Sequence, residues 1–381
     1  MTLNTPILPP AMLGILGGGQ LGRMFAIAAK TMGYRVTVLD PDPDAPAAEF
    51  ADRHLCAPFD DAAALNELAQ CAAVTTEFEN VNADSMRFLA THTRVSPSGD
   101  CVAVAQNRIQ EKARIQKAGL QTAPYQAVCK VEDISEASAE FLPGILKTAT
   151  LGYDGKGQIR VKTLAELQAA FAELGGVDCV LEKMVDLRGE ISVIVCRLDS
   201  ENVQTFDPAE NIHENGILAY SVVPARLPQD IQQQARQMAR RLADELDYVG
   251  VLAVELFAVG DTHELVVNEI APRPHNSGHH TIDACAADQF QQQVRIMCGL
   301  PPADTRLLSP CCMANILGDV WGADGGEPDW LPLQRDPAAH LHQYGKQAAR
   351  KGRKMGHFTV LANDAGTAFE HACVLHSTLA K

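Results

Sequence analysis

Two glutamates in the second half of the chain have the chemistry and the spacing of metal ligands. Glu255 stands inside the apolar run "VGVLAVELFAV", and Glu269 follows fourteen residues later in "ELVVNEIAPRP". Burying a carboxylate without a partner is costly, so an apolar strand that carries one predicts a cation beside it. A hairpin of this length brings both carboxylates to one place, where oxygen ligands suit Mg²⁺ and nucleotide phosphates. The alternative is two ordinary salt bridges.

A glycine-rich loop between two predicted strands is a second candidate for phosphate chemistry. In "PGILKTATLGYDGKGQIRV" the backbone amides near the glycines could close over phosphates, while Lys147 and Lys156 would add positive charge. The alternative is a surface hairpin without a ligand. The next apolar strand, "CVLEKMV", carries Glu182 and Lys183, and its backbone could pair with the edge of an adenine ring or simply present one polar face. The glycines of the loop are Gly152, Gly155 and Gly157.

A third glycine motif stands near the start, in "MLGILGGGQLGRM". Gly17, Gly19 and Gly22 fit the G-x-G-x-x-G pattern of dinucleotide-binding domains. Asp40, at the end of "YRVTVLD", stands where an acidic residue would hold the ribose of a nicotinamide cofactor. A dehydrogenase is therefore one hypothesis, but it leaves the carboxylate pair and the second glycine loop without a role.

Two polar segments follow the carboxylates. In "APRPHNSGHHT", His275 and His279 have a spacing that zinc sites use, but proline and glycine interrupt any helix that would align them, which favours a polar loop beside the carboxylates. The basic segment "YGKQAARKGRKMGH" stands in an acidic chain. It is either a solvated basic face or a clamp for a phosphate or a carbonate.

The elements that must position these residues follow an alternating pattern. From Met12 to about Pro97, apolar strands alternate with helical stretches, which predicts a parallel, Rossmann-like sheet with its ligand edge at the carboxyl ends of the strands. With 381 residues the chain exceeds one typical domain. We expect three: residues 1–105, 106–300 and 301–381.

Composition narrows the class of protein. The 32 basic against 47 acidic residues give a formal charge of -15, which argues against broad contact with nucleic acid but allows a local phosphate pocket. The eleven cysteines form no C-x-x-C pair and are expected to be reduced. No signal-like start and no apolar run of eighteen residues is present, so we expect a cytoplasmic protein without membrane contact.

Taken together, the motifs resemble a known family. "GGGQLGRM", "TTEFEN", "GYDGKGQ", "VELF", "NEIAPRPHNSGHHT" and "YGKQAARKGRKMGH" are similar, in this order along the whole chain, to those of the 5-(carboxyamino)imidazole ribonucleotide synthases, ATP-grasp enzymes of purine biosynthesis. The resemblance implies an α/β fold with an N-terminal Rossmann-like pre-ATP-grasp domain, a central two-part ATP-grasp domain and a small C-terminal domain. One departure is His280, where many relatives carry an aromatic residue.

The resemblance also implies a set of site residues. Glu255 and Glu269 would hold Mg²⁺, with Mn²⁺ as an alternative ion. The ribonucleotide would lie in the N-terminal domain, with its 5'-phosphate on the amides of the first glycine loop. The residues implied for the ribonucleotide are Gly19, Gln20, Leu21, Glu77, Tyr153, Asp154, Arg273, Lys346 and Arg353. Those implied for ATP are Arg108, Lys147, Gly152, Tyr153, Asp154, Gly155, Lys156, Gly157, Gln158, Glu182, Lys183, Met184, Val185, Glu190, His213, Asn268 and Glu269. Those nearest the chemistry are Lys147, Asp154, Arg273, Lys346 and Arg353.

The activity that the resemblance implies is a carboxylation driven by ATP. ATP would phosphorylate bicarbonate to carboxyphosphate, and the exocyclic amine of 5-aminoimidazole ribonucleotide would take up the carboxyl group, releasing phosphate. A homodimer is also implied. The rival hypotheses are the dehydrogenase, an ATP-grasp transformylase that uses formate and should lack the "RKMGH" segment, and a nucleotide sensor without catalysis, which the intact glutamate pair disfavours.

Overall fold

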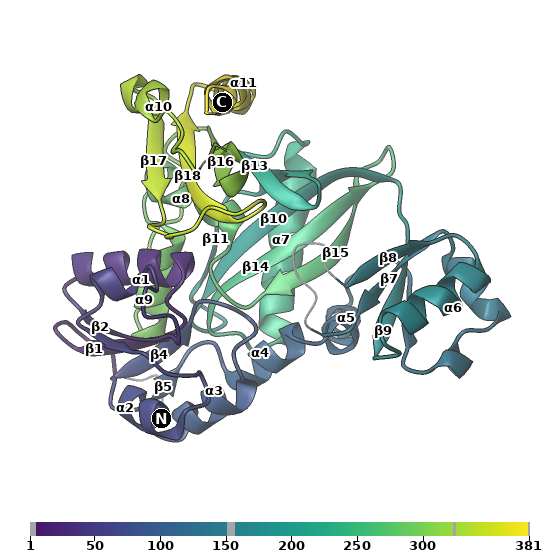
Figure 1. Ribbon diagram of the computed structural model, residues 1–381, viewed down its shortest axis with the longest axis horizontal. Coiled ribbons are helices and arrows are strands. Elements are labelled where there is room, and N and C mark those ends of the chain that lie inside the picture. Colours follow the sequence, from purple (N-terminus) through teal and green to yellow (C-terminus); the bar gives the residue numbers. More distant parts are fainter. Residues whose placement is uncertain (1–4, 151–156, 323–324, 380–381) are drawn as a thin grey trace.

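The computed structural model describes residues 5–150, 157–322 and 325–379. Within these residues the strands form three sheets of five, four and nine strands. Figure 1 shows the N-terminal unit at the lower left, the four-stranded unit at the right, and the large sheet running between them and up to the C-terminus. The α/β class and the parallel N-terminal sheet predicted from the sequence are confirmed.

The N-terminal unit is a parallel sheet with the strand order β3-β2-β1-β4-β5. Its central strand, "MLGIL", is almost entirely buried, as expected for a parallel strand with helices on both faces. The strands are β1 (Met12–Leu16), β2 (Arg35–Leu39), β3 (Arg53–Leu55), β4 (Ala73–Thr76) and β5 (Arg94–Val95). The helices are α1 (Gln20–Thr31), α2 (Ala62–Leu68), α3 (Ala83–Ala90) and α4 (Gly99–Ala105).

The four-stranded unit is antiparallel, with the order β6-β9-β7-β8. The sequence around the second glycine loop forms the β7–β8 hairpin, as predicted. Leu146 and Leu181 of this sheet pack against Leu167 and Phe171 of the helix that covers it. The elements are β6 (Tyr125–Val128), β7 (Gly144–Thr148), β8 (Gln158–Val161), β9 (Cys179–Lys183) and α6 (Leu164–Glu173).

The large sheet has the order β15-β14-β10-β12-β13-β16-β18-β17, with β11 paired to β10 beside this path. All its pairs are antiparallel. Its strands are β10 (Leu187–Arg197), β11 (Val203–Thr205), β12 (Ala209–Glu214), β13 (Ile217–Val223), β14 (Gly250–Val259), β15 (Glu264–Ala271), β16 (Cys311–Leu317), β17 (Ala339–Gln343) and β18 (Lys354–Leu361).

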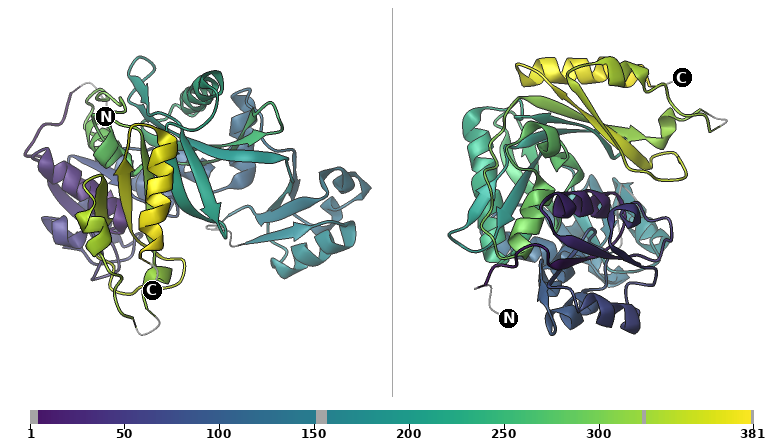
Figure 2. Two further views of the ribbon diagram at one scale, coloured as in Figure 1. Left: turned by 90° about the horizontal axis from the view of Figure 1, so that it is seen from above. Right: turned by 90° about the vertical axis from the view of Figure 1, so that its left-hand side faces the viewer.

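Helices cover the large sheet and tie it to the other units. Helix α7 buries an apolar stripe on β10 and β14, and α11 packs on β16 and β18, where Figure 2 shows it lying across the upper strands. The remaining α-helices are α5 (Arg108–Lys117), α7 (Gln229–Glu245), α8 (Thr281–Ala284), α9 (Gln289–Met297), α10 (Leu331–Arg335) and α11 (Ala365–Ser377). Short 3₁₀ helices are η1 (Ala48–Phe50), η2 (Val131–Asp133), η3 (Glu136–Phe141), η4 (Asn276–Gly278) and η5 (Gly318–Val320).

The large sheet continues past the domain boundary that we expect at residue 300. Strand β13 pairs with β16, so Tyr220 lies opposite Ala314 and Val223 opposite Cys311. Helix α9, which comes before the boundary, packs on α1 of the N-terminal unit through Phe290 and neighbouring apolar residues. The three expected domains therefore share cores and backbone hydrogen bonds.

Two further expectations concern the chain as a whole. All eleven cysteines lie in the described residues and are free thiols, most of them buried, as expected for reduced core residues. In the described part of the chain, no helix has the length and apolar character needed to cross a membrane.

Candidate active site

The β14–β15 hairpin brings the two predicted metal ligands together. Glu255 lies directly opposite Glu269, while Leu256 lies opposite Val267, so Asn268 is an extra residue in β15. Such a bulge re-aims the side chains beside it, and Asn268 and Glu269 are both partly exposed between buried neighbours. The carboxylates and the side-chain oxygen of Asn268 form an all-oxygen donor set, which fits Mg²⁺.

Each of these carboxylates also has a nitrogen partner from the protein. Arg108 Nη1 lies 2.8 Å from Glu269 Oε2, and His275 Nε2 lies 2.9 Å from Glu255 Oε1. Burial alone would raise the pKa of Glu255, but His275 and other nearby cations lower it. The two salt bridges that the sequence left open as the alternative are thus present, and a divalent ion would have to share these carboxylates with Arg108 and His275.

A third carboxyl group, Glu111, lies behind this pair and was not predicted. Its Oε1 accepts a hydrogen bond of 2.7 Å from the backbone amide of Ile270, which fixes α5 to β15. Burial and the nearby carboxylate of Glu269 raise the pKa of Glu111 to about 8, although Arg108 opposes the shift. Glu111 therefore holds the strand beside Glu269 in place.

Glu182 of β9 lies between two ammonium groups. Lys147 Nζ is 2.7 Å from Glu182 Oε2, and Lys112 Nζ is 2.8 Å from Glu182 Oε1. All three side chains are buried, and Lys112 also lies over the ring of Tyr125, 5.5 Å from its centre. Burial alone would raise the pKa of Glu182, but the two lysines lower it to about 2. Lys112 was not predicted, although its place four residues after Arg108 puts both on one face of α5.

The rest of the segment expected to bind ATP is only partly described. Lys147 and Gln158 lie opposite each other on the β7–β8 pair, and Gly157 adopts a φ of +69° that favours glycine. Met184, just after β9, is 44% exposed. The other loop residues expected to bind ATP or the ribonucleotide, namely Gly152, Tyr153, Asp154, Gly155 and Lys156, lie outside the described residues.

Glu190 and His213 form a pair on neighbouring strands of the large sheet. Nδ1 of His213 lies 3.1 Å from Oε2 of Glu190, and both side chains are partly exposed. Burial would lower the pKa of His213, but its bond to Glu190 raises it. The carboxylate of Glu255 also raises this pKa, so the pair lies within electrostatic reach of the metal-ligand hairpin.

Glu77 occupies part of the first glycine loop. Its carboxylate accepts hydrogen bonds from the backbone amides of Gly19 and Gly22, the latter at 2.6 Å. Asp40, the residue that a dehydrogenase would use for ribose, instead accepts from the amide of Gly18 at 2.7 Å. A Cβ atom on Gly17 would lie 2.3 Å from Glu77 Cγ. The glycines therefore leave room for a protein side chain, Glu77, whereas the sequence motif predicts that they leave room for a ligand.

The loop nevertheless keeps two backbone donors. Helix α1 has no side-chain cap, and the amides of Gln20 and Leu21 donate to no protein group in the described residues. Lys346 Nζ, from the basic segment, lies 2.7 Å from Gln20 Oε1. Two amides at the positive end of a helix thus belong to the segment whose Gln20 side chain binds Lys346, which is an arrangement suited to a phosphate.

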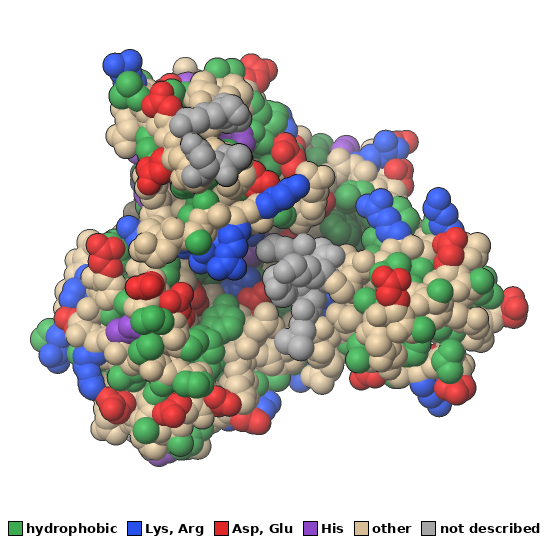
Figure 3. Space-filling model, in the orientation of Figure 1, with side chains coloured by type: hydrophobic (Ala, Val, Ile, Leu, Met, Phe, Trp, Pro, Cys, Tyr) green, Lys and Arg blue, Asp and Glu red, His purple; other side chains and the backbone are tan. Residues whose placement is uncertain are grey.

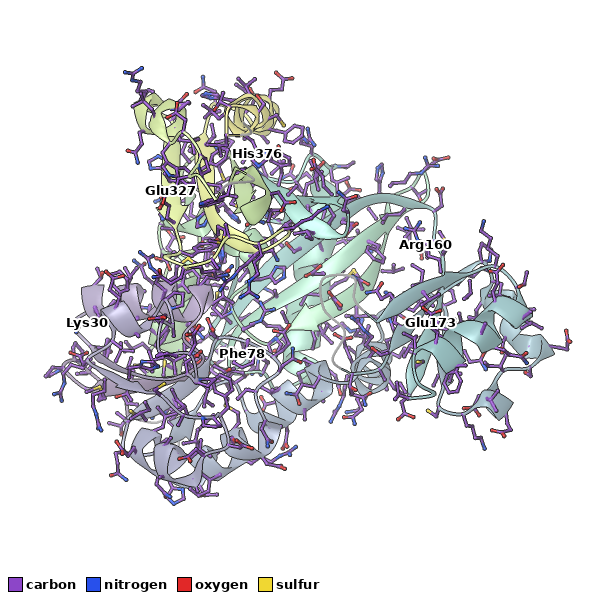
Figure 4. The ribbon with its side chains drawn as sticks, in the orientation of Figure 1. Lys30, Phe78, Arg160, Glu173, Glu327 and His376 are labelled. Carbon is purple, nitrogen blue, oxygen red and sulfur yellow. The ribbon has the colours of Figure 1, made fainter. Side chains whose placement is uncertain are left out.

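Arg273 joins the glycine loop to the metal-ligand hairpin. Its Nε pairs with Glu79 of "TTEFEN", and the Arg273 guanidinium lowers the pKa of Glu79 to about 2 although burial would raise it. Burial would lower the pKa of Arg273 itself, but surrounding carboxylates raise it, first Glu79 and then Glu255 and Glu77. Phe78, between the two glutamates, lies at the side of the N-terminal unit that faces the large sheet (Figure 4).

The basic segment follows β17 and lies over the N-terminal unit. Lys346, Arg350 and Arg353 line a small pocket of about 150 Å³ together with Asp42 and Asp44. In Figure 3, Lys and Arg side chains gather near the middle of this face, between the N-terminal unit below and the C-terminal strands above. Three basic and two acidic side chains thus share one pocket, and the clamp and the solvated face both stay predictions.

The histidine-containing segment divides into two parts. His275 pairs with Glu255, as expected for a polar loop beside the carboxylates. His279 and His280 are buried and turn to other partners: His279 Nδ1 accepts from Gln289 at 3.1 Å, and His280 Nδ1 lies 2.8 Å from the carbonyl oxygen of Ser277. Burial lowers the pKa of His280 to about 4. His280, which stands where many relatives carry an aromatic residue, therefore lies behind the site rather than in it.

Comparison with known proteins matches each of the three units. The ribonucleotide synthetase pre-ATP-grasp domain matches residues 11–106, the ATP-grasp domain residues 113–290, and the phosphoribosylaminoimidazole carboxylase C-terminal domain residues 311–371. A Bacillus subtilis protein, N5-carboxyaminoimidazole ribonucleotide synthase, is 46% identical over 93% of this chain and 92% of its own. The chain belongs to the N5-carboxyaminoimidazole ribonucleotide synthase family.

Two solved structures of N5-carboxyaminoimidazole ribonucleotide synthases extend this likeness to the fold. One, an ADP complex, is 44% identical and superimposes with a TM-score of 0.90 over 98% of both chains. The other, from Aspergillus clavatus, is a complex with ADP and 5-aminoimidazole ribonucleotide. It is 30% identical, with a TM-score of 0.87 over 99% of both chains. The chain is therefore an ATP-grasp ligase by family and by fold.

Proposed function

We propose that this chain uses ATP and bicarbonate to carboxylate the exocyclic amine of 5-aminoimidazole ribonucleotide, giving N5-carboxyaminoimidazole ribonucleotide, ADP and phosphate. The proposal rests on the position of Arg273. It pairs with Glu79 beside the glycine loop and lies within electrostatic reach of Glu255 in the metal-ligand hairpin. One residue would thus link the proposed phosphate site in the N-terminal unit to the proposed nucleotide site in the ATP-grasp unit.

The part of the site proposed to bind ATP lies between the four-stranded sheet and the large sheet. Arg108, Lys147 and the strand end at Glu182 would contact ATP, with Glu190 and His213 nearby on the large sheet. Glu255, Glu269 and Asn268 would hold Mg²⁺ or Mn²⁺. Such an ion neutralises charge on the transferred phosphoryl group. Lys147 supplies further positive charge at this place, and its bond to Glu182 fixes where that charge lies.

The ribonucleotide half lies at the first glycine loop. The amides of Gln20 and Leu21 would bind the 5'-phosphate, and Lys346 and Arg353 would complete its neutralisation. Glu77 would face the sugar from its place on the loop amides. Arg273 would position the reacting groups at the junction. Tyr153 and Asp154 stay predictions for this half.

The chemistry requires positioning more than a side-chain nucleophile. A bicarbonate oxygen attacks the γ-phosphorus and ADP leaves, giving carboxyphosphate. The amine nitrogen then attacks the carboxyl carbon, phosphate leaves, and the amine loses a proton. Because carboxyphosphate hydrolyses in water, the residues around Arg273 must hold the amine close to it and keep water out. We further propose a cytoplasmic homodimer in de novo purine synthesis that binds small molecules and no nucleic acid.

The decisive experiment measures phosphate release from ATP with 5-aminoimidazole ribonucleotide and bicarbonate, added singly and together. We expect rapid release only with both present, one carboxylated product per phosphate, and no turnover after EDTA treatment until Mg²⁺ returns. Phosphate release at the same rate with and without the ribonucleotide would overturn the proposal. Release that needs formate in place of bicarbonate would indicate a transformylase, and a fluorescence change of NADH on binding would revive the dehydrogenase.

A further inference from the structure

Three histidines and one aspartate converge behind the candidate active site. His342 of β17 lies with Nε2 3.1 and 3.0 Å from the two carboxylate oxygens of Asp283 in α8. His340, two residues before it on the same face of β17, has Nδ1 3.9 Å from Asp283 Oδ1. His357 lies opposite His342 on the β17–β18 pair. The proposed function uses none of these four side chains.

The geometry of this cluster is compact. The rings of His342 and His357 stack with their centres 4.6 Å apart and their planes 12° from parallel. One ligand atom from each of Asp283, His342 and His357 lies within 4.8 Å of the other two. Ligand atoms of a tetrahedral Zn²⁺ site, with bonds of about 2.0–2.1 Å, lie roughly 3.3 Å apart. Asp283 and His342 already have that spacing, whereas a separation of 4.8 Å within the group must close by roughly 1.5 Å, and the stacked rings of His342 and His357 must turn so that both lone pairs meet one ion.

His357 carries the second, independent observation. It is fully buried, and its Nε2 has no hydrogen-bond partner in the part of the chain that the structure describes. Its other ring nitrogen, Nδ1, lies 2.9 Å from the Tyr344 hydroxyl. A histidine that binds a metal typically donates its second ring N–H to such a partner, which leaves the first nitrogen with a free lone pair. Burying this nitrogen without a partner is costly.

A simple ion pair between Asp283 and His342 explains only part of this arrangement. It accounts for neither the unpartnered nitrogen of His357 nor the approach of His340 to the same carboxylate. Two imidazole nitrogens and a carboxylate oxygen form a donor set that suits Zn²⁺ better than Mg²⁺. We propose that Asp283, His342 and His357 bind one Zn²⁺ ion, with His340 as the nearest fourth ligand.

The position of the site indicates a structural role. Asp283 belongs to α8, which follows the histidine-containing segment, while His342 belongs to β17, just before the basic segment, and His357 is the last residue of that segment and belongs to β18. Lys346 follows β17 after three residues and contacts Gln20 at the glycine loop. A metal bond between α8 and the β17–β18 pair would therefore fix the base of the segment that carries Lys346. It would stabilise this unit and take no direct part in the carboxylation.

Zinc binding by the purified full-length protein tests this inference. After EDTA treatment and its removal, Zn²⁺ is titrated against a chromophoric chelator, and Co²⁺ is titrated separately for its visible absorption bands. We expect one tight equivalent per chain, and an affinity at least a hundredfold weaker in Asp283→Asn and in His342→Gln. Tyr344→Phe should weaken binding ten- to a hundredfold, because it removes only the partner of His357 Nδ1.

Matched controls separate this site from others. His371→Gln breaks a similar pair, in which His371 Nε2 lies 2.7 Å from Asp336, and should leave zinc affinity unchanged. Glu269→Gln alters the proposed Mg²⁺ site and should also leave it unchanged. Zn²⁺ should raise the melting temperature of the wild type but not that of His342→Gln. Failure of the wild type to bind at micromolar zinc, full binding by His342→Gln, or loss of binding in Glu269→Gln would each overturn the inference.

Discussion

Replacing Lys112 by methionine tests whether the buried cluster around Glu182 organises the nucleotide half of the site. The substitution keeps an unbranched side chain of similar length but removes an ammonium group that is 1% exposed and lies 2.8 Å from Glu182. Lys147, on the other side of Glu182, remains. The carboxylate thus keeps one of its two cations, and the loss is smaller than the 3–5 kcal/mol typical of a buried charge left alone.

The magnitude follows from the pKa of Glu182. A pKa of about 2 in place of 4.5 corresponds to about 3 kcal/mol of stability at neutral pH, shared between the two lysines. We expect Lys112→Met to lower the free energy of unfolding by about 2 kcal/mol. Because the folded pKa is depressed, this contribution is fully present above pH 4.5 and is lost as the pH falls toward 2. The difference between wild type and variant should shrink in the same range.

The assay is urea unfolding at pH 7 and at steps down to about pH 2.5, which cover the range in which the contribution of Glu182 is lost, together with the KM for ATP. Without Lys112, Glu182 is held less firmly and therefore positions Lys147 less well. The KM for ATP should then rise on the order of tenfold, about 1.4 kcal/mol, with kcat less affected. Lys117→Met is the matched control on the same helix. Lys117 is 64% exposed and pairs with Glu245 at the surface, so this change should cost less than about 0.5 kcal/mol. Equal effects of the two substitutions would refute the reasoning.

Three further predictions concern the other parts of the site. Glu269→Gln should abolish ATP turnover with the fold intact, and near-normal rates at ordinary Mg²⁺ would contradict the metal assignment. Gly17→Val should weaken binding of the ribonucleotide far more than that of ATP, because a side chain there collides with Glu77; calorimetry with each ligand gives the ranking, and the opposite order would favour a nucleotide at this loop. Lys346→Ala should reduce kcat/KM for the ribonucleotide by one to two decades, about 1.5–3 kcal/mol, with an unchanged melting temperature. Lys351→Ala, exposed in the same segment, should change neither, and equal kinetics in the two variants would return the segment to a solvated face.

The parts of the site that are built from elements adjacent in the sequence could be predicted from the sequence. The apolar run that contains Glu255 and the strand that ends near Glu269 predict a hairpin, and the two residues are register partners in it. The alternating pattern of the first hundred residues predicts the parallel sheet in the same way. In both cases a local periodicity decides which residues share a face, so no knowledge of distant segments is needed.

The contacts that complete the site join segments far apart in the chain. Glu77 reaches the amide of Gly19 across 58 residues, and Arg273 reaches Glu79 across 194. The charged residues can be identified in the sequence, but their ion pairs cannot, because many acidic residues could pair with each cation. The glycine motif predicts a site for a ligand phosphate, whereas in the structure the carboxylate of Glu77 accepts from two of its backbone amides. Only the packing of the strand β4 beside β1 decides that arrangement.

The pairing of β13 with β16 has a practical consequence for anyone who divides the chain. A fragment that ends near residue 300 would contain the whole ATP-grasp segment, yet it would leave β13 as an open edge with unpaired backbone amides from Tyr220 to Val223. It would also uncover the apolar side chains of Tyr220 and Val222, which pack under α11 in the full chain. Exposed edges of this kind recruit strands from other molecules. Such a fragment should aggregate, and expression of the ATP-grasp segment by itself requires a redesigned β13.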